Sequence, residues 1–169
     1  MKRFILPFIV TFFFLFESSF VDLVPSEIFH DEQIFVPRFL MILIVFITIY
    51  HNKIGGLLYG IILGLLYDVV YTEVLGVYMF SMPLIAYIIS QASRILQTNI
   101  IIISFLSIFG IAILELFVYG VNLAIGIATM SFDRFLELRQ LPTLLLNSIF
   151  ITIFSYPIKK LLGKLQIQE

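Results

Sequence analysis

The sequence predicts an all-α integral membrane protein with six transmembrane helices, and three observations support this fold class. Hydrophobic residues make up 61% of the 169 residues and charged residues only 12%, whereas soluble domains average about 45–50% and 25%. The apolar residues form runs of the length that a helix needs to cross a bilayer, about 20 residues. Short polar turns separate these runs and leave no room for a soluble domain. We therefore predict a single transmembrane domain over residues 1–169.

Six apolar segments are the candidate spans. They cover residues 4–24, 37–50, 54–70, 74–90, 100–121 and 141–157. The first is interpreted as an uncleaved helix, because "FESSFVDLVP" offers no small-x-small cleavage site. The tight turns "HNK" and "YTE" join the second span to the third and the third to the fourth, and Thr72 is the candidate N-cap of the fourth.

The placement of Lys and Arg predicts that both chain termini face the cytoplasm. Cytoplasmic loops of membrane proteins carry an excess of these residues, and here seven fall on one side of the predicted bundle and three on the other. The larger set is Lys2, Arg3, Lys53, Arg94, Lys159, Lys160 and Lys164, and the smaller set is Arg38, Arg134 and Arg139. We therefore expect a multi-pass protein of the plasma membrane.

Two segments are expected to lie along the membrane surface. The tail "IKKLLGKLQIQE" is basic and amphipathic. Its residues Lys159, Lys160 and Lys164 are expected to anchor it to anionic lipids of the inner leaflet, at roughly 1 kcal/mol each. On the outer side, residues 131–140 form an amphipathic segment that is either an ordinary loop helix or a surface that binds a partner.

Gly56, Gly60 and Gly64 recur at intervals of four in the third span. Such a row stays near one helix face, because four residues turn a helix by only ~40° beyond a full turn. Small residues in a row of this kind let helix backbones approach closely in lipid. Two interpretations remain open: the row packs against another helix of this chain, or it accepts the transmembrane helix of another protein.

Five polar residues fall at similar depth in the outer half of the predicted spans. They are Glu17, Arg38, Asp68, Glu115 and Asn147. Ionisable groups inside a membrane are costly, so they normally face the bundle interior and have a partner. Arg38 and Asp68 both oppose the dipole of their own helix, and we therefore expect them to pair across the hairpin. The layer is interpreted as structural, although a proton-coupled transporter could also use it.

The sequence carries no signature of catalysis. It has no cysteine, only two histidines, and neither an H-E-x-x-H nor a G-x-S-x-G motif. No span carries the tight cluster of carboxylates that would hold a divalent ion. We therefore expect no enzyme activity, no metal and no cofactor.

Residues 36–80 carry a set of positions with a family pattern: Pro37 at the start of the second span, Gly56, Gly60, Gly64, Asp68 and the segment "LGVYMF" with Gly76. This pattern resembles the MreD family of rod shape-determining proteins. The start "MKRFILPF" and the segment "LPTLLLNSIF" look like the Bacillus-type branch. The resemblance implies a fold similar to the S-component of energy-coupling-factor vitamin transporters, and it brings no catalytic residues.

The resemblance also implies a role and partners. Family members are inner-membrane components of the cell-wall elongation machinery. They associate with MreC, and through it with MreB filaments, the glycan polymerase RodA and a class B penicillin-binding protein. We therefore expect a non-catalytic membrane scaffold needed for rod shape, which contacts membrane lipids and no nucleic acid. The alternative is a subunit of the S-component type that binds or transports a small molecule or lipid precursor.

Overall fold

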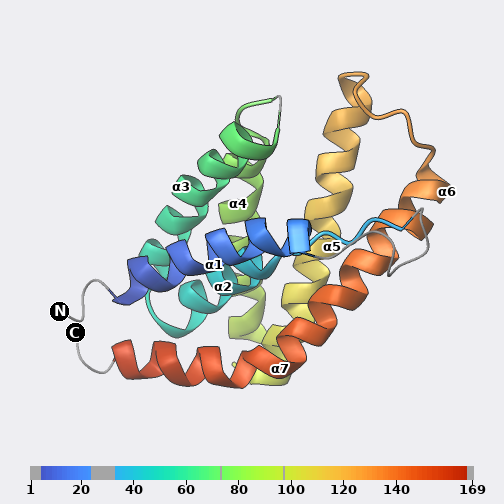
Figure 1. Cartoon of the computed structure of the whole chain (residues 1–169). Helices are drawn as coiled ribbons and strands as arrows, with labels where there is room; N and C mark the ends of the chain where they lie inside the picture. The colour runs from blue at the N-terminus through green and yellow to red at the C-terminus, as the bar shows by residue number, and fades with distance from the viewer. Residues whose placement is uncertain (1–4, 24–32, 73, 97, 167–169) are drawn as a thin grey trace.

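The computed structural model describes residues 5–23, 33–72, 74–96 and 98–166, which form helices and connecting segments without strands. The elements are α1 (Ile5–Leu23), α2 (Phe39–Tyr50), α3 (Lys53–Tyr71), α4 (Val77–Ile95), α5 (Ile100–Ala124), α6 (Phe132–Phe135), the π-helix η3 (Leu136–Gln140) and α7 (Leu141–Gln166). The predicted all-α class is confirmed. Helix α3 packs on α4 and α4 on α5, and α1 crosses in front of them in Figure 1.

Helix α2 lies at the centre of the molecule. Its sequence FLMILIVFITIY is apolar on every side, and a helix of that kind is stable when it is buried all round. Every residue from Phe39 to Thr48 is buried, and α2 packs against α1, α3, α4, α5 and α7. The remaining long helices therefore form a shell around α2.

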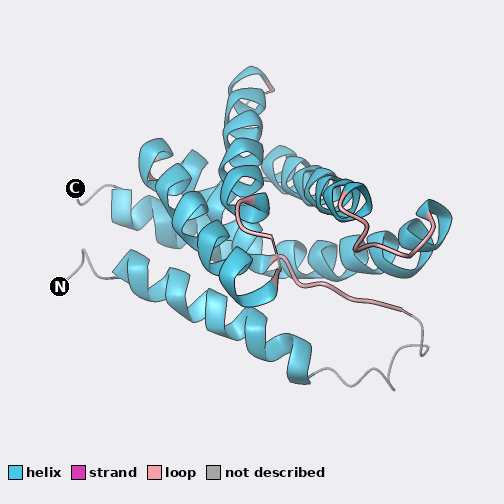
Figure 2. Ribbon diagram, turned by 90° about the horizontal axis from the view of Figure 1, so that it is seen from above, coloured by secondary structure: helices cyan, strands magenta, loops and turns pink. Residues whose placement is uncertain are grey.

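Three helical stretches in the described residues are long and apolar enough to cross a membrane. They are Lys53–Tyr71, Ile100–Ala124 and Phe132–Gln166, whereas α1 and α2 contribute shorter apolar stretches. The third stretch runs through α6, η3 and α7, so the expected outer surface segment continues directly into the last helix. The start of α1 and the end of α7 lie at the same end of the molecule in Figures 1 and 2. An arrangement of six spans, and its orientation, stay predictions.

The glycine row of α3 faces the chain's own helices. A Cβ atom added to Gly56 would lie 2.7 Å from the Cα of Thr48 in α2. One added to Gly60 would lie 3.2 Å from the backbone of α4, and one added to Gly64 would lie 2.6 Å from the Cα of Met79 in α4. The row is therefore filled by α2 and α4. The other interpretation, that a helix of another protein docks on this row, is wrong.

The start of α4 differs from the prediction. Thr72, the expected N-cap, instead ends α3, and its hydroxyl donates to the carbonyl oxygen of Asp68 at 2.9 Å. Helix α4 begins after Gly76, which has a φ of 104°. Glycine adopts this left-handed conformation without the steric cost that a Cβ brings. The turn between α3 and α4 is consequently longer than a single capping residue requires.

We expect Gly64→Ala to lower the thermal stability, because the added methyl group meets the backbone of α4 and overpacking costs about 1–3 kcal/mol. Gly120→Ala in α5 is the matched control, since no described atom lies within 4 Å of its added Cβ and alanine favours a helix over glycine. Thermal unfolding of the detergent-purified proteins, followed by circular dichroism, should place Gly64→Ala below wild type and Gly120→Ala at or above it. Equal midpoints for the two variants would contradict a close contact between α3 and α4.

Candidate functional site

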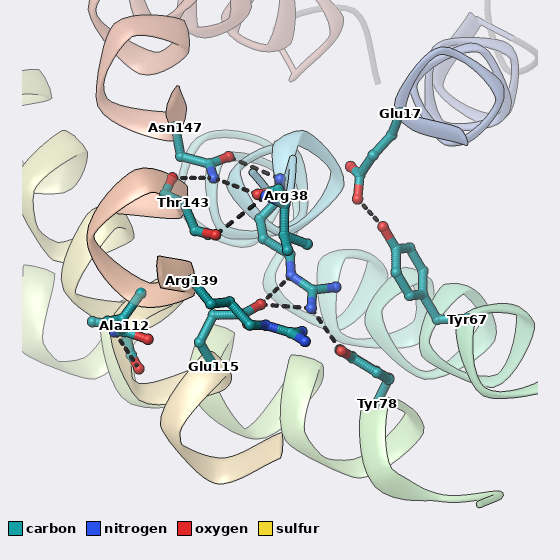
Figure 3. A network of polar contacts seen from close by, with 11 residues as sticks. Glu17, Arg38, Tyr67, Tyr78, Ala112, Glu115, Arg139, Thr143 and Asn147 are labelled. Carbon is teal, nitrogen blue, oxygen red and sulfur yellow. Dashed lines mark hydrogen bonds and ion pairs between the residues drawn. The ribbon is translucent and has the colours of Figure 1, made fainter. Parts of the chain in front are cut away.

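The five residues of the predicted polar layer are all buried. The side chains of Asp68, Glu115 and Asn147 are fully enclosed, and Glu17 and Arg38 are only 2% exposed. Four of the five surround the start of α2. Figure 3 shows Arg38 between Asn147 and Glu115, with Glu17 apart from them and beside a tyrosine of α3. The fifth, Asp68, belongs to a separate group at the start of α4.

The guanidinium of Arg38 forms a buried ion pair with Glu115 of α5. Arg38 ends the connecting segment 33–38 that precedes α2, and its Nε and Nη2 lie 2.6 Å and 2.5 Å from Oε1 of Glu115. Nη2 also donates to the hydroxyl of Tyr78 at 2.6 Å, and Cζ lies 4.8 Å from the centroid of that ring. Charge-assisted hydrogen bonds and contact with an aromatic face both stabilise a cation that is shielded from water.

A second arginine shares the same carboxylate. Arg139 of η3 donates through Nε to Oε2 of Glu115 at 3.0 Å, and its side chain is 30% exposed. The next residue, Gln140, donates to the carbonyl oxygen of Ala112 in α5 at 3.2 Å. The wider π-helical turn of η3 thus brings two consecutive side chains onto α5, and such turns are frequent at functional sites.

Side chains of α7 hold the connecting segment that precedes α2. Oδ1 of Asn147 accepts the backbone N–H of Arg38 at 2.8 Å, and its amide nitrogen donates to the carbonyl oxygen of Val36 at 3.0 Å. Thr143, one turn earlier, accepts the N–H of Val36 at 3.2 Å. Pro37 lies between them and has no N–H to satisfy. The backbone groups of Val36 and Arg38, which lie outside any helix, therefore have their hydrogen-bond partners on α7.

Glu17 of α1 caps the buried start of α2. Its Oε2 accepts the N–H of Leu40 at 2.7 Å, and its Oε1 accepts the hydroxyl of Tyr67 from α3. The first N–H groups of a helix have no partner within the helix and carry partial positive charge. A carboxylate at this place satisfies a donor and complements the dipole, which explains the acid in an apolar helix.

Asp68 caps the start of α4 in the same way as Glu17 caps the start of α2. The prediction that Asp68 pairs with Arg38 is wrong. Its Oδ1 accepts the N–H of Tyr78 at 2.8 Å, and its Oδ2 accepts those of Gly76 and Met79 at 2.9 Å and 3.0 Å. The carboxylate is disfavoured at the C-terminal end of α3, but the N-terminal end of α4 compensates for this. No cation is needed for the compensation.

Five residues of the network escape sequence-based prediction. They are Tyr67, Tyr78, Arg139, Gln140 and Thr143. The tyrosines count as part of the apolar runs, and Arg139 is expected at the outer surface. The sequence offers one signal: Thr143 and Asn147 are polar residues of a largely apolar segment and are four residues apart, so they share a helix face.

The arrangement pairs its acids within the chain. In the described ranges, no group of three His, Cys, Asp or Glu side chains could hold a metal ion. Both carboxylate oxygens of Glu17, Asp68 and Glu115 accept hydrogen bonds from the protein itself. The network therefore ties α1, α3, α4, α5, η3 and α7 to the start of the central helix.

Comparison with known proteins identifies the family. A family model described as rod shape-determining protein MreD matches residues 2–165. The chain belongs to the MreD family. The Rod shape-determining protein MreD of Bacillus subtilis (strain 168) is 38% identical over 159 residues, which cover 94% of this chain and 92% of that protein. The Cell shape-determining protein MreD of Streptococcus pneumoniae (strain ATCC BAA-255 / R6) is 24% identical over 159 residues, covering 90% of this chain and 92% of that one.

No solved structure matches the chain significantly, so the expected similarity to the S-component fold gains no support. The residues that carry the MreD resemblance lie at close contacts of the fold. The glycine row touches α2 and α4, Gly76 bonds to Asp68, and Pro37 is buried directly before Arg38. The residues of 36–80 that carry the MreD resemblance therefore contribute to helix packing and helix capping in this fold.

The lysines of the tail lie in the last part of α7. Lys160 and Lys164 are exposed, and Nζ of Lys159 lies 5.1 Å from the ring centroid of Tyr50. Their position at one end of a long helix leaves the ammonium groups available to anionic headgroups. Anchoring of this MreD-family chain to the inner leaflet stays a prediction.

We expect Arg38→Met and Glu115→Leu each to destabilise the protein by about 3–5 kcal/mol, because each leaves a buried charge without its partner. The double variant should lose less stability than the sum of the losses in the two single variants, with a coupling energy of at least ~1 kcal/mol. Chemical unfolding in detergent measures the four free energies of this cycle. Arg94→Met, which removes an exposed arginine at the end of α4, is the control and should change little. Strictly additive losses would show that the two buried charges act independently.

Proposed function

We propose that this chain is a non-catalytic membrane scaffold of the bacterial cell-wall elongation complex and is needed for rod shape. Membership of the MreD family supports the shape-determining role, and both relatives are named for it. In this proposal the chain acts with MreC and MreB to position or regulate peptidoglycan synthases. RodA and the class B penicillin-binding protein are reached through MreC.

The internal pairing of the acids is the observation that carries the scaffold role. Glu17, Asp68 and Glu115 each use both carboxylate oxygens to hold other elements of this chain. A proton relay or ion pathway in a membrane needs ionisable groups that face a route for the substrate. Acids that are fully engaged in caps and ion pairs instead make the bundle rigid, and a rigid bundle presents a constant outer surface to partners.

We propose that the MreC transmembrane helix contacts the face of α7 that points away from the other helices of this chain. The glycine row is filled, so a small-residue face for a partner must lie elsewhere. Ser148 and Thr152 are four residues apart and line a shallow groove of about 330 Å³ together with Leu145, Ile149 and Ile153. Small residues at this spacing allow close approach of a second helix, and the apolar side chains beside them add packing area.

Depletion of the protein in its source cell should convert rods into rounded and bulging cells, because wall synthesis is then no longer guided along the cylinder. Phase-contrast microscopy scores the change, and re-expression of the wild-type chain should restore rods. Unchanged rods with loss of uptake of a nutrient would contradict the scaffold and favour the alternative, a subunit of the S-component type for a small molecule or lipid precursor.

The double variant Ser148→Leu/Thr152→Leu should reduce the amount of MreC that co-purifies with this chain several-fold, because two bulky side chains then fill the groove. Gly120→Leu is the matched control, since it adds a leucine side chain to an open position on α5. Affinity purification from co-expressing membranes, with quantitative immunoblotting, measures the ratio of the two proteins. An unchanged ratio in the double variant would remove α7 as the MreC contact.

A further inference from the structure

A cavity of about 270 Å³ lies where the end of α5, the loop 125–131 and η3 meet. Its aromatic wall is formed by Tyr119 and Phe135, whose ring centroids are 4.2 Å apart in a stacked arrangement. The hydroxyl of Tyr119 donates to the carbonyl oxygen of Met130 at 2.8 Å, which holds the loop against this wall. The polar side chains of Asn122, Thr129 and Arg139 also line the cavity. The cavity is therefore preformed, with a rigid aromatic wall and polar groups in the same lining.

The side chains of Arg139 and Asn122 keep unused hydrogen-bonding capacity. Arg139 uses Nε for Glu115, and within the part of the chain that the structure describes its two Nη atoms have no hydrogen-bond or ion-pair partner. A guanidinium has five N–H donors, so most of them remain available. The side-chain amide of Asn122 has no partner among the described residues either, since its contacts with Ile127 and Ala128 use the backbone carbonyl oxygen.

Arg139 is the partly exposed cation beside the cavity. Among the described residues its ion-pair partner is Glu115, whose carboxylate is shared with the buried Arg38. The side chain of Arg139 is 30% exposed, whereas those of Arg38 and Glu115 are buried. The described residues that line the cavity include no Asp or Glu. An anion that enters the cavity therefore meets a cation and no carboxylate among the described lining residues.

We propose that this cavity binds a negatively charged phosphate group, with Arg139 as the principal ligand and Asn122 as a second donor. The planar fork of a guanidinium matches two oxygens of a phosphate. The volume is slightly below the ~300–1,000 Å³ of pockets for drug-sized ligands, so it suits a phosphate with a few attached atoms. The site is independent of the scaffold role proposed above.

The position of the cavity favours a lipid as the source of the phosphate. Helix α5 is long and apolar enough to cross a membrane, and the cavity lies at its C-terminal end, where Leu123 and Ile125 are exposed beside it. A phospholipid can place its headgroup in the cavity and its acyl chains along this apolar surface. A soluble phosphate shares the same recognition chemistry, and the experiment distinguishes the two sources.

The first arm of the test uses the full-length chain, purified in mild detergent and stripped of lipid. Native mass spectrometry follows titration with phosphatidylglycerol, which has a net negative charge, and with phosphatidylcholine, which has none. Wild type should retain one phosphatidylglycerol in preference to phosphatidylcholine. Arg139→Gln should weaken this binding roughly tenfold or more, because charge-assisted hydrogen bonds to the phosphate are lost. Arg134→Gln, an arginine of α6 that does not line the cavity, is the control and should bind like wild type.

The second arm measures thermal stability in sodium phosphate and in sodium chloride at equal ionic strength. Stabilisation of wild type by phosphate, lost in Arg139→Gln, without a lipid preference in the first arm, supports the site and assigns it to a soluble phosphate. Asn122→Leu, which leaves the contact with Glu115 intact, should weaken the same ligand several-fold and keeps the test decisive if Arg139→Gln does not fold. Absence of any preference in both arms, or equal losses in Arg134→Gln and Arg139→Gln, would overturn the proposal.

Discussion

The buried ion pair between Arg38 and Glu115 is the contact on which the arrangement of the helices depends. Moving either ion out of water costs several kcal/mol, so neither group tolerates a packing in which the other is absent. In lipid, apolar side chains give little preference for one rotation of a helix over another. The pair supplies that preference, because it holds α5 against the start of α2, and the contacts of Tyr78 and Arg139 extend it to α4 and η3.

Two further acids accept hydrogen bonds from N–H groups at the ends of helices that lie inside the protein. The starts of α2 and α4 both expose N–H groups in places where water is scarce, and Glu17 and Asp68 accept from them. In both cases the acid comes from a neighbouring helix, so each cap is also a tertiary contact. The glycine row and Asp68, which belong to the MreD pattern, both serve the contact between α3 and α4. The glycines bring α3 and α4 together, and the carboxylate then reaches the backbone of α4.

The position of a residue along its helix can be predicted from a sequence. The neighbouring helix that its side chain faces cannot, because this depends on how each helix is rotated about its axis. Apolar runs predict the helices, and the spacing of Gly56, Gly60 and Gly64 predicts a close contact, because both depend on periodicity alone. The partner of Arg38 depends on how α5 is rotated, and a pattern of spans therefore favours Asp68 on the adjacent span over Glu115. Backbone N–H groups are also absent from side-chain patterns, which is why capping by Asp68 could not be foreseen. The contacts of Tyr67 and Tyr78 cannot be predicted, because their rings follow the apolar pattern while their hydroxyls form hydrogen bonds inside the protein.

The enclosure of α2 has a consequence for how the chain is made. At ~1.5 Å per residue and ~30 Å for the hydrocarbon layer, its 12 residues are too few to settle across a bilayer unaided. Arg38 finds its carboxylate 77 residues further along and its backbone partner 109 residues further along. A nascent chain that ends after α4 therefore lacks the Glu115 partner of Arg38 and the contacts of α2 with α5 and α7. The second apolar helix to leave the ribosome therefore gains its full set of contacts only after α5 and α7 have been made.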